Sequence, residues 1–271
     1  MRLYVVRHAQ SANNALLVPS LMNPDRDADP TLTEAGFKQA AALGKYVAEA
    51  FGEKAAALGR VKPCDAVKKL VVSPMRRCML TATPISKQLG IPIRVKQDIH
   101  EHGGCFDGAA DQPGGGIGRP GLSKPQLEAE FPGCVVPIEL MKGWWSEEQG
   151  CETVPQAQER VARVVKWLWE QAENWKEKDG ALMIVVHGMF IDILIKALSG
   201  AALTAGKQQM VFCSQNAGIH VLELKPGTDA ANPGNVAGLQ MFNIVDHLPP
   251  DIRTGGSVEG LDDCYMNEGS A

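Results

Sequence analysis

Six consecutive apolar residues at positions 181–186 constrain the fold more than any other stretch of the chain. The run has no polar position and follows Gly180, which is typical of a strand buried on both faces of a parallel sheet. His187 and Gly188 come directly after it, and an apolar helix is expected over residues 189–198. The pattern predicts a central strand that ends at a histidine and leads into a helix.

Two other apolar runs are followed by cationic residues. Residues 3–6 precede Arg7 and His8, and residues 69–72 precede a segment that contains Arg77. In a parallel sheet with right-handed crossovers, the carboxyl ends of such strands lie at one edge, and ligands bind open α/β sheets just beyond that edge. These junctions are therefore expected to bring two arginines and two histidines around one anion, which suggests a phosphate pocket.

The junction after the second run predicts the start of a helix. Ser73 is a good N-cap, and Pro74 suits the first helical position, where its missing N–H costs nothing. Arg77 then falls in the first turn, where exposed backbone N–H groups and the helix dipole already attract anions. Gly90 is the expected C-cap.

Strands and helices are also expected elsewhere in the chain. A helix should begin after the N-cap Thr33, with Phe37 and Ala40 among its apolar positions, and a capping-box pattern at Thr153 begins a long helix. Further strands are expected at residues 91–95, 219–224 and 239–245, the first of them at an edge. We predict one domain over residues 1–271, a three-layer α/β/α sandwich around a central, mostly parallel sheet.

Residues 98–152 differ from the rest because glycine and proline recur throughout them. Loops this long in a compact domain are usually functional lids or binding loops. We therefore expect a lid inserted into the domain, with a short helix over residues 124–131. Trp144 and Trp145 either line the pocket beneath it or pack the segment onto the body.

Charge and cysteine content restrict the partners and the compartment. With 27 basic and 31 acidic residues the net charge is −4. The sequence therefore lacks the excess of positive charge that is typical of proteins that bind nucleic acid or an anionic membrane. The seven cysteines have no C-x-x-C spacing, so they are expected to be reduced thiols. No apolar run approaches the roughly 20 residues of a membrane span. A cytoplasmic protein is expected.

Five short motifs in this order resemble those of the histidine phosphatase superfamily, which includes the cofactor-dependent phosphoglycerate mutases. Residues 7–14 resemble its R-H-G-x-x-x-x-N opening, residues 32–40 resemble L-T-x-x-G-x-x-Q-A, and residues 73–82 resemble S-P-x-x-R-x-x-x-T-A. Glu101 with the two glycines at 103 and 104, and the run Val186-His187-Gly188, complete the set. The resemblance implies a phosphoglycerate mutase-like fold, in agreement with the predicted sandwich.

The resemblance also implies a chemistry. Neutral His8 would attack phosphorus and form a phosphohistidine, with its other ring nitrogen held as a donor to a backbone carbonyl. Arg7 and Arg77 would bind the phosphoryl oxygens, and His187 and Asn14 would add donors. His187 is thus both a catalytic and a phosphate-binding candidate. No metal and no cofactor is expected.

Glu101 is the third catalytic candidate. The resemblance implies that it protonates the leaving oxygen and later deprotonates the attacking water, which calls for a pKa raised toward neutrality. The expected function is a metal-independent phosphomonoesterase, a histidine acid-type phosphatase, acting on a small phosphorylated metabolite. A mutase that uses the same phosphohistidine is the alternative, and it ranks second because the mutases' E-R-H-Y-G run is missing after Glu101. A non-catalytic phosphate-binding scaffold is the third hypothesis, and the chain could also form a homo-oligomer.

Several of these residues also allow a purely structural interpretation. His8 could be a hydrogen-bonded core histidine, and Arg77 could cap a helix or pair with a carboxylate. His220 lies in a strand pattern and is expected to be structural, and Arg76 is expected to point to solvent. Ala9 stands where the family has glycine, which would be unfavourable if that position required a positive φ.

Overall fold

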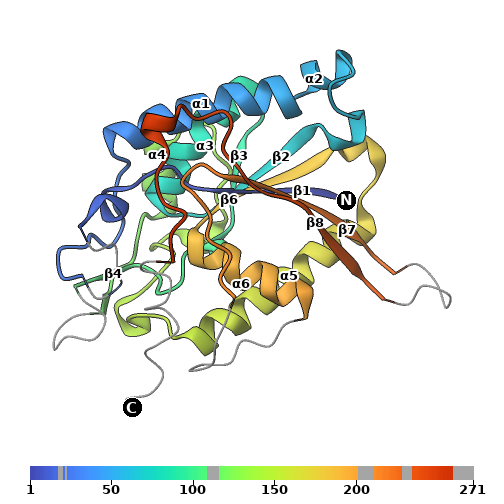
Figure 1. Cartoon of the computed structure of the whole chain (residues 1–271). Helices are drawn as coiled ribbons and strands as arrows, with labels where there is room; N and C mark the ends of the chain where they lie inside the picture. Colours follow the sequence, from blue (N-terminus) through green and yellow to red (C-terminus); the bar gives the residue numbers. More distant parts are fainter. Residues whose placement is uncertain (18–20, 22, 109–115, 201–209, 228–233, 259–271) are drawn as a thin grey trace.

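Six strands form the central sheet of the computed structural model, which describes residues 1–17, 21, 23–108, 116–200, 210–227 and 234–258. The strands are β1 (Arg2–Arg7), β2 (Val67–Val72), β3 (Ile93–Val95), β6 (Ala181–Val186), β7 (Ile219–Lys225) and β8 (Val236–Ile244). Their order across the sheet is β3-β2-β6-β1-β7-β8 (Figure 1). The first four of that order are parallel, and β7 and β8 run antiparallel to their neighbours. The mostly parallel sheet matches the prediction.

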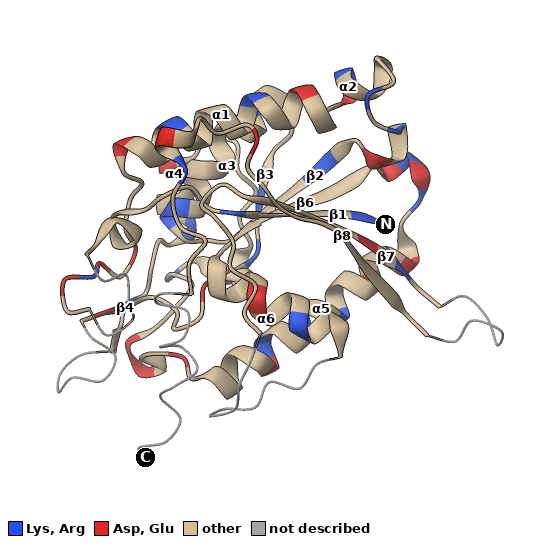
Figure 2. Ribbon diagram, viewed as in Figure 1, with Lys and Arg blue, Asp and Glu red and all other residues tan. Residues whose placement is uncertain are grey.

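The strand β6 lies at the centre of the sheet, between β1 and β2. All six of its side chains are buried, and its ribbon carries no charged residue (Figure 2). It pairs in parallel with both neighbours. The apolar run at residues 181–186 is therefore the doubly buried strand that the sequence predicts.

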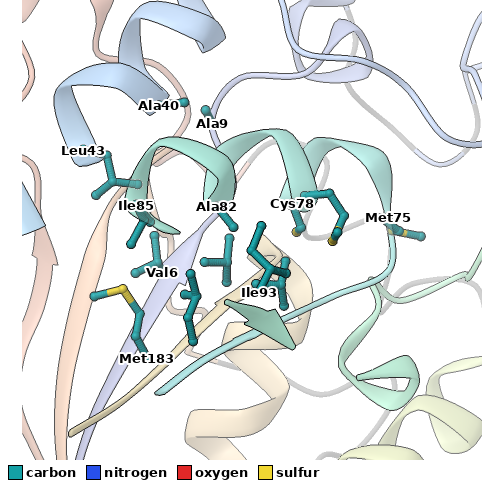
Figure 3. Packing of buried hydrophobic residues seen from close by; sticks show 14 of the residues in the cluster. Val6, Ala9, Ala40, Leu43, Met75, Cys78, Ala82, Ile85, Ile93 and Met183 are labelled. Carbon is teal, nitrogen blue, oxygen red and sulfur yellow. The ribbon is translucent and has the colours of Figure 1, made fainter. Parts of the chain in front are cut away.

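Four helices cover the two faces of the sheet. They are α1 (Glu34–Phe51) and α3 (Arg76–Leu89) on one face, and α5 (Val154–Asn174) and α6 (Gly188–Ser199) on the other (Figure 1). The side chains of β1 alternate between the two layers: Tyr4 and Val6 join one hydrophobic cluster, and Leu3 and Val5 join the second. Figure 3 shows Ile85 of α3 near Val6 in the first cluster. The protein is a three-layer sandwich, as predicted.

The predicted helix boundaries are confirmed in most places. Thr33 caps α1 by accepting a hydrogen bond from the backbone N of Gly36, and Thr153 forms the capping box of α5. Gly90 adopts a left-handed conformation as the C-cap of α3. The face of α1 differs from the prediction, because Phe37 is 48% exposed.

The start of α3 differs from the prediction that Ser73 is the N-cap. Its N-cap is Met75, so Ser73 and Pro74 lie before the helix. The backbone N of Ser73 still donates to the carbonyl oxygen of Val185 at 3.1 Å, so this residue continues the strand. The carboxylate of Asp29, from a distant loop, accepts from the backbone N of Arg76 at 2.9 Å and takes the capping role.

The edge strands and the inserted segment also follow the predicted pattern. β3 lies at one edge of the sheet and begins after Pro92. Residues 98–152 hold the short helix α4 (Lys124–Glu130) and a small two-stranded sheet, β4 (Phe106–Asp107) and β5 (Ile117–Gly118). Trp144 is buried in the core cluster, which supports the packing interpretation for that residue. That the segment acts as a lid stays a prediction.

One short helix, α2 (Glu53–Ala57), follows α1. In the part of the chain that the structure describes, no helix combines the length and the apolar character needed to span a bilayer.

We expect Gly44→Ala to destabilise the fold because α1 and α3 approach each other closely at this residue. A Cβ on Gly44 would lie 2.8 Å from the backbone carbon of Pro84 in α3. Forcing such a contact costs about 1–3 kcal/mol, which outweighs the roughly 1 kcal/mol that alanine gains over glycine in a helix. Urea unfolding measures the difference. The exposed neighbour Lys45→Ala is the control, and a Gly44→Ala protein as stable as this control would contradict the packing argument.

Candidate active site

His8 follows the end of β1 and is 2% exposed. Its backbone N donates to the carbonyl oxygen of Val186 at 2.8 Å, which ties it to the neighbouring strand. The ring atom Nδ1 lies 2.7 Å from the carbonyl oxygen of Ala9. A carbonyl oxygen can only accept, so Nδ1 carries the proton and Nε2 presents its lone pair.

Arg77 contacts the other nitrogen of this ring. Its Nε donates to Nε2 of His8 at 3.2 Å, and a guanidinium has no acceptor, so Nε2 is unprotonated. Burial lowers the pKa of His8 well below its usual value, and the positive charges of Arg77 and Arg7 lower it further. His8 is therefore a neutral imidazole whose Nε2 lone pair points at a cation.

His187 follows β6 and is completely buried. Its ring lies edge-on to that of His8, with 5.1 Å between the ring centroids. The hydroxyl of Ser73 contacts Nε2 at 2.8 Å. Burial and then the charge of Arg77 lower the pKa of His187 well below its usual value, so this ring is also neutral. Ser73 thus contacts the second histidine instead of capping α3.

Arg7 lies at the N-terminal end of α6. A Cβ on Gly188 would be 3.2 Å from Cζ of Arg7, so the guanidinium occupies space that this glycine leaves free. Its Nη1 donates to the carbonyl oxygen of Ser214. Its Nε is buried and has no hydrogen-bond partner among the described residues. An arginine keeps its charge when buried, so this N–H is a donor available to an anion.

Glu101 is placed at the same helix end. Its Oε1 accepts from the backbone N of Phe190 at 2.9 Å and of His102 at 3.0 Å, and its Oε2 accepts from that of Met189 at 3.3 Å. The carboxylate therefore binds the first turn of α6, next to His187. Its negative charge also opposes the lowering of the pKa of Arg7 by burial.

Asn14 joins the site through a residue that sequence reasoning missed. The amide of Asn216 donates from Nδ2 to Oδ1 of Asn14 at 3.1 Å and to the carbonyl oxygen of His8 at 3.2 Å. The hydroxyl of Ser11 also donates to Oδ1 of Asn14. With Oδ1 engaged in these bonds, Nδ2 of Asn14 is the group that can donate to a ligand.

The structure thus brings together all six candidate residues, which are Arg7, His8, Asn14, Arg77, Glu101 and His187. It adds Thr81, whose Oγ1 accepts from the backbone N of Ala9 at 3.0 Å. Ala9 has no positive φ, so alanine fits where the family has glycine. Thr81 belongs to the motif at residues 73–82, but nothing in that motif indicates that the threonine contacts the backbone beside His8.

The two remaining predictions concern residues outside the site. His220 is buried and hydrogen-bonded on both nitrogens, to the hydroxyl of Ser214 at 2.8 Å and to the backbone N of Asn243 at 3.0 Å, which confirms its structural role. Arg76 was expected to point to solvent, but its Nη1 pairs with Glu130 at 2.8 Å. Within the described ranges, no three His, Cys, Asp or Glu side chains are grouped as metal ligands would be.

Solved structures of known proteins share this fold. A mycobacterial glucosyl-3-phosphoglycerate phosphatase in complex with VO3 aligns with a TM-score of 0.53 and 21% identity over 90% of this chain and 99% of that one. A phosphoserine phosphatase from Entamoeba histolytica, in complex with 3-phosphoglyceric acid, aligns with a TM-score of 0.50 and 16% identity over 92% and 99% of the two chains.

The sequence comparisons give a family. No curated protein sequence matches the chain significantly. Residues 3–113 and 121–233 match the family described as the histidine phosphatase superfamily (branch 1). These two segments cover most of the chain and include all six candidate site residues. The chain therefore belongs to the histidine phosphatase superfamily.

Proposed function

We propose that this protein is a metal-independent phosphomonoesterase, a histidine acid-type phosphatase that works through a phosphohistidine on His8. The observation that carries the proposal is the tautomer of His8. The hydrogen bond from Nδ1 to the carbonyl oxygen of Ala9 keeps the proton on Nδ1, so Nε2 has an unprotonated lone pair. In-line attack on phosphorus requires such a lone pair. A structural histidine would not need the guanidinium of Arg77 against that nitrogen, nor a second arginine, Arg7, whose charge also lowers the pKa of the ring.

The first step transfers the phosphoryl group to the enzyme. Nε2 of His8 forms a bond to phosphorus while the bond between phosphorus and the ester oxygen breaks, and that oxygen takes a proton from Glu101. Oε2 of Glu101 is suited to hold this proton because it accepts a single hydrogen bond, at 3.3 Å, whereas Oε1 accepts two. The products are a phosphohistidine and an alcohol.

The second step returns the enzyme to its starting state. Ionised Glu101 takes a proton from water, the water oxygen bonds to phosphorus, and the bond between phosphorus and Nε2 breaks. Inorganic phosphate leaves, and His8 is again neutral. The low pKa of His8 keeps its nitrogen unprotonated at neutral pH, so no proton has to be removed before the next attack.

The cations supply the electrostatic part of the mechanism. Arg77 donates to Nε2 in the free enzyme and would turn to the phosphoryl oxygens when a substrate lies between them. The unpartnered Nε of Arg7 would donate to the same group, with His187 and Asn14 adding hydrogen bonds. Fixed donors of this kind neutralise the developing charge, which is the task that a metal ion performs in other phosphatases.

The substrate class is inferred from the family and its neighbours. The two solved structures described above are named as phosphatases of glucosyl-3-phosphoglycerate and of phosphoserine, both small phosphorylated metabolites. We propose a substrate of this class. Hydrolysis is favoured over mutase activity by the residues after Glu101, His102-Gly103-Gly104, which do not form the E-R-H-Y-G run typical of the mutases.

The proposal is tested first by product analysis. With EDTA present, a panel of phosphomonoesters that includes 3-phosphoglycerate and an aryl phosphate should release inorganic phosphate as the main product, at the same rate as without chelator. Isomerised phosphoglycerate without free phosphate would show a mutase. Loss of activity in EDTA that Mg²⁺ or Zn²⁺ restores would contradict a metal-independent mechanism.

His8→Ala should abolish both turnover and covalent labelling. Wild-type enzyme quenched in denaturant after mixing with ³²P-labelled substrate should carry acid-labile, base-stable label, because the phosphoryl group resides on a ring nitrogen. The variant should carry none. Far-UV circular dichroism of the variant checks that it is folded. Label that persists in folded His8→Ala protein would exclude this residue as the nucleophile.

Glu101→Gln should slow the reaction according to the leaving group. A general acid contributes about 10²–10⁴-fold, so hydrolysis of an alkyl phosphate should fall by this factor. With p-nitrophenyl phosphate, the rate of the first step should fall far less, because its leaving group needs little protonation. Single-turnover release of p-nitrophenol measures that step, and equal losses on the two substrates would remove Glu101 from the acid role.

A further inference from the structure

The segment that carries Glu101 has little regular structure of its own. Glu101 lies between a short 3-10 turn, Gln97–Ile99, and two glycines with positive φ at 103 and 104. No pairing within the central sheet fixes its backbone. The position of its carboxylate at the α6 N-terminus must therefore be set by contacts from elsewhere in the fold.

Arg160 of α5 supplies the contacts on one side of Glu101. Its Nη1 donates to the carbonyl oxygen of Asp98 at 2.9 Å and to that of His100 at 3.0 Å. Arg160 is 4% exposed, and its guanidinium lies over the ring of Phe190, with Cζ 5.8 Å from the centroid. The backbone N of Phe190 is itself a donor to Glu101. Arg160 thus contacts both the segment that carries Glu101 and the helix that binds its carboxylate.

Glu152 holds the arginine and binds the segment on the other side. Its carboxylate accepts from Nε of Arg160 at 2.7 Å and from Nη2 at 2.6 Å. Its backbone N donates to the carbonyl oxygen of Gly103 at 3.0 Å. The side chain of Arg160 therefore binds the chain at residues 98 and 100, and the backbone of Glu152 binds it at residue 103, so the two partners contact the chain on both sides of Glu101.

Fold stability alone does not require an ion pair at this position. Both partners are buried, Glu152 at 6% exposure, and well-packed apolar residues are often as stabilising as a buried ion pair. Apolar residues would, however, leave the carbonyl groups of Asp98 and His100 without these donors. The planar fork of arginine reaches two carbonyl groups and a carboxylate at once, which a single ammonium cannot do.

We propose that Arg160, held by Glu152, is a positioning residue that sets Glu101 for proton transfer. This inference rests on the proposed function, because it assigns the ion pair to the step in which Glu101 acts as acid. Among the described residues, the hydrogen bonds of Arg160 go to Glu152, Asp98 and His100, and none goes to His8, Arg7 or Arg77. Loss of Arg160 should therefore impair protonation of the leaving group and leave phosphate binding unchanged.

Arg160→Lys is the first test, since it keeps the charge and removes the fork. We expect kcat on an alkyl phosphate to fall about tenfold to a hundredfold, the range that a small misplacement of a catalytic group produces. KM and inhibition by inorganic phosphate should not change, and single-turnover release of p-nitrophenol should fall much less. The control is Arg163→Lys, one turn further along α5 and exposed, which should behave as wild type.

A double-mutant cycle separates positioning from stability. In the Glu101→Gln background, Arg160→Lys should change the rate little, because the group that it positions no longer transfers a proton. A loss of the same factor in both backgrounds, or an equal loss on both substrates in the wild-type background, would overturn the positioning role.

Glu152→Gln provides a second variant should Arg160→Lys not fold. It keeps the shape of the side chain and one acceptor for the guanidinium, so a smaller loss with the same dependence on leaving group is expected. Folded Glu152→Gln protein without that dependence would overturn the proposal.

Failure of the proposed function and failure of the positioning role give different results. Wild-type protein that releases no phosphate from any ester would overturn the proposed function and the positioning role with it. A wild-type enzyme whose Glu101→Gln variant shows the leaving-group effect, while Arg160→Lys and Glu152→Gln do not, would overturn the positioning role alone.

Discussion

The parallel pairing of β1 with β6 is the constraint on which the rest of the site depends. Arg7 is in register with Val186, so His8 and His187 are the next residues on adjacent strands, and their rings meet edge to face. A slip of one residue would move every side chain of β1 to the other face of the sheet. In the observed register Tyr4 and Val6 pack into one hydrophobic layer and Leu3 and Val5 into the other. The core therefore determines where the two histidines lie.

Burial then determines their protonation. Both rings are buried and close to arginines, and both influences disfavour the imidazolium form. The balance is different at Asp29, where burial raises the carboxyl pKa to about 6 against the opposing charge of Arg77. The site thus combines permanent positive charge on arginines with neutral histidines. A nucleophile and an anion-binding site can coexist there because the positive charge lies on the arginines and not on the histidines.

The sequence was sufficient for the parallel half of this arrangement. Apolar runs end at Val6 and Val186, and the rule that parallel strands end at one edge is enough to group the residues that follow them. Asn216 could not be found in this way, because it lies before the start of β7 and not after the end of a strand. Since β7 is antiparallel to β1, its start lies at the edge of the sheet where β1 ends. Gln39 illustrates a second limit. Gln39 of α1 is buried whereas Phe37 of the same helix is exposed. Gln39 hydrogen-bonds the backbone of Gln10 and Ile252, and partners so far away in the chain give no periodic pattern in the sequence of the helix.

The alanine beside the nucleophile shows which property of that position matters. The carbonyl oxygen of Ala9 accepts a hydrogen bond from Nδ1 of His8, and its backbone N donates to Oγ1 of Thr81, so both polar groups of this residue are engaged. Its Cβ joins the cluster beneath α1 and α3, where it lies near Ala40 (Figure 3). With no positive φ at this position, alanine has fewer unfolded conformations to lose than glycine, which favours the folded state by about 0.4–1 kcal/mol. Alanine therefore stabilises the fold at the residue whose carbonyl group fixes the tautomer of His8.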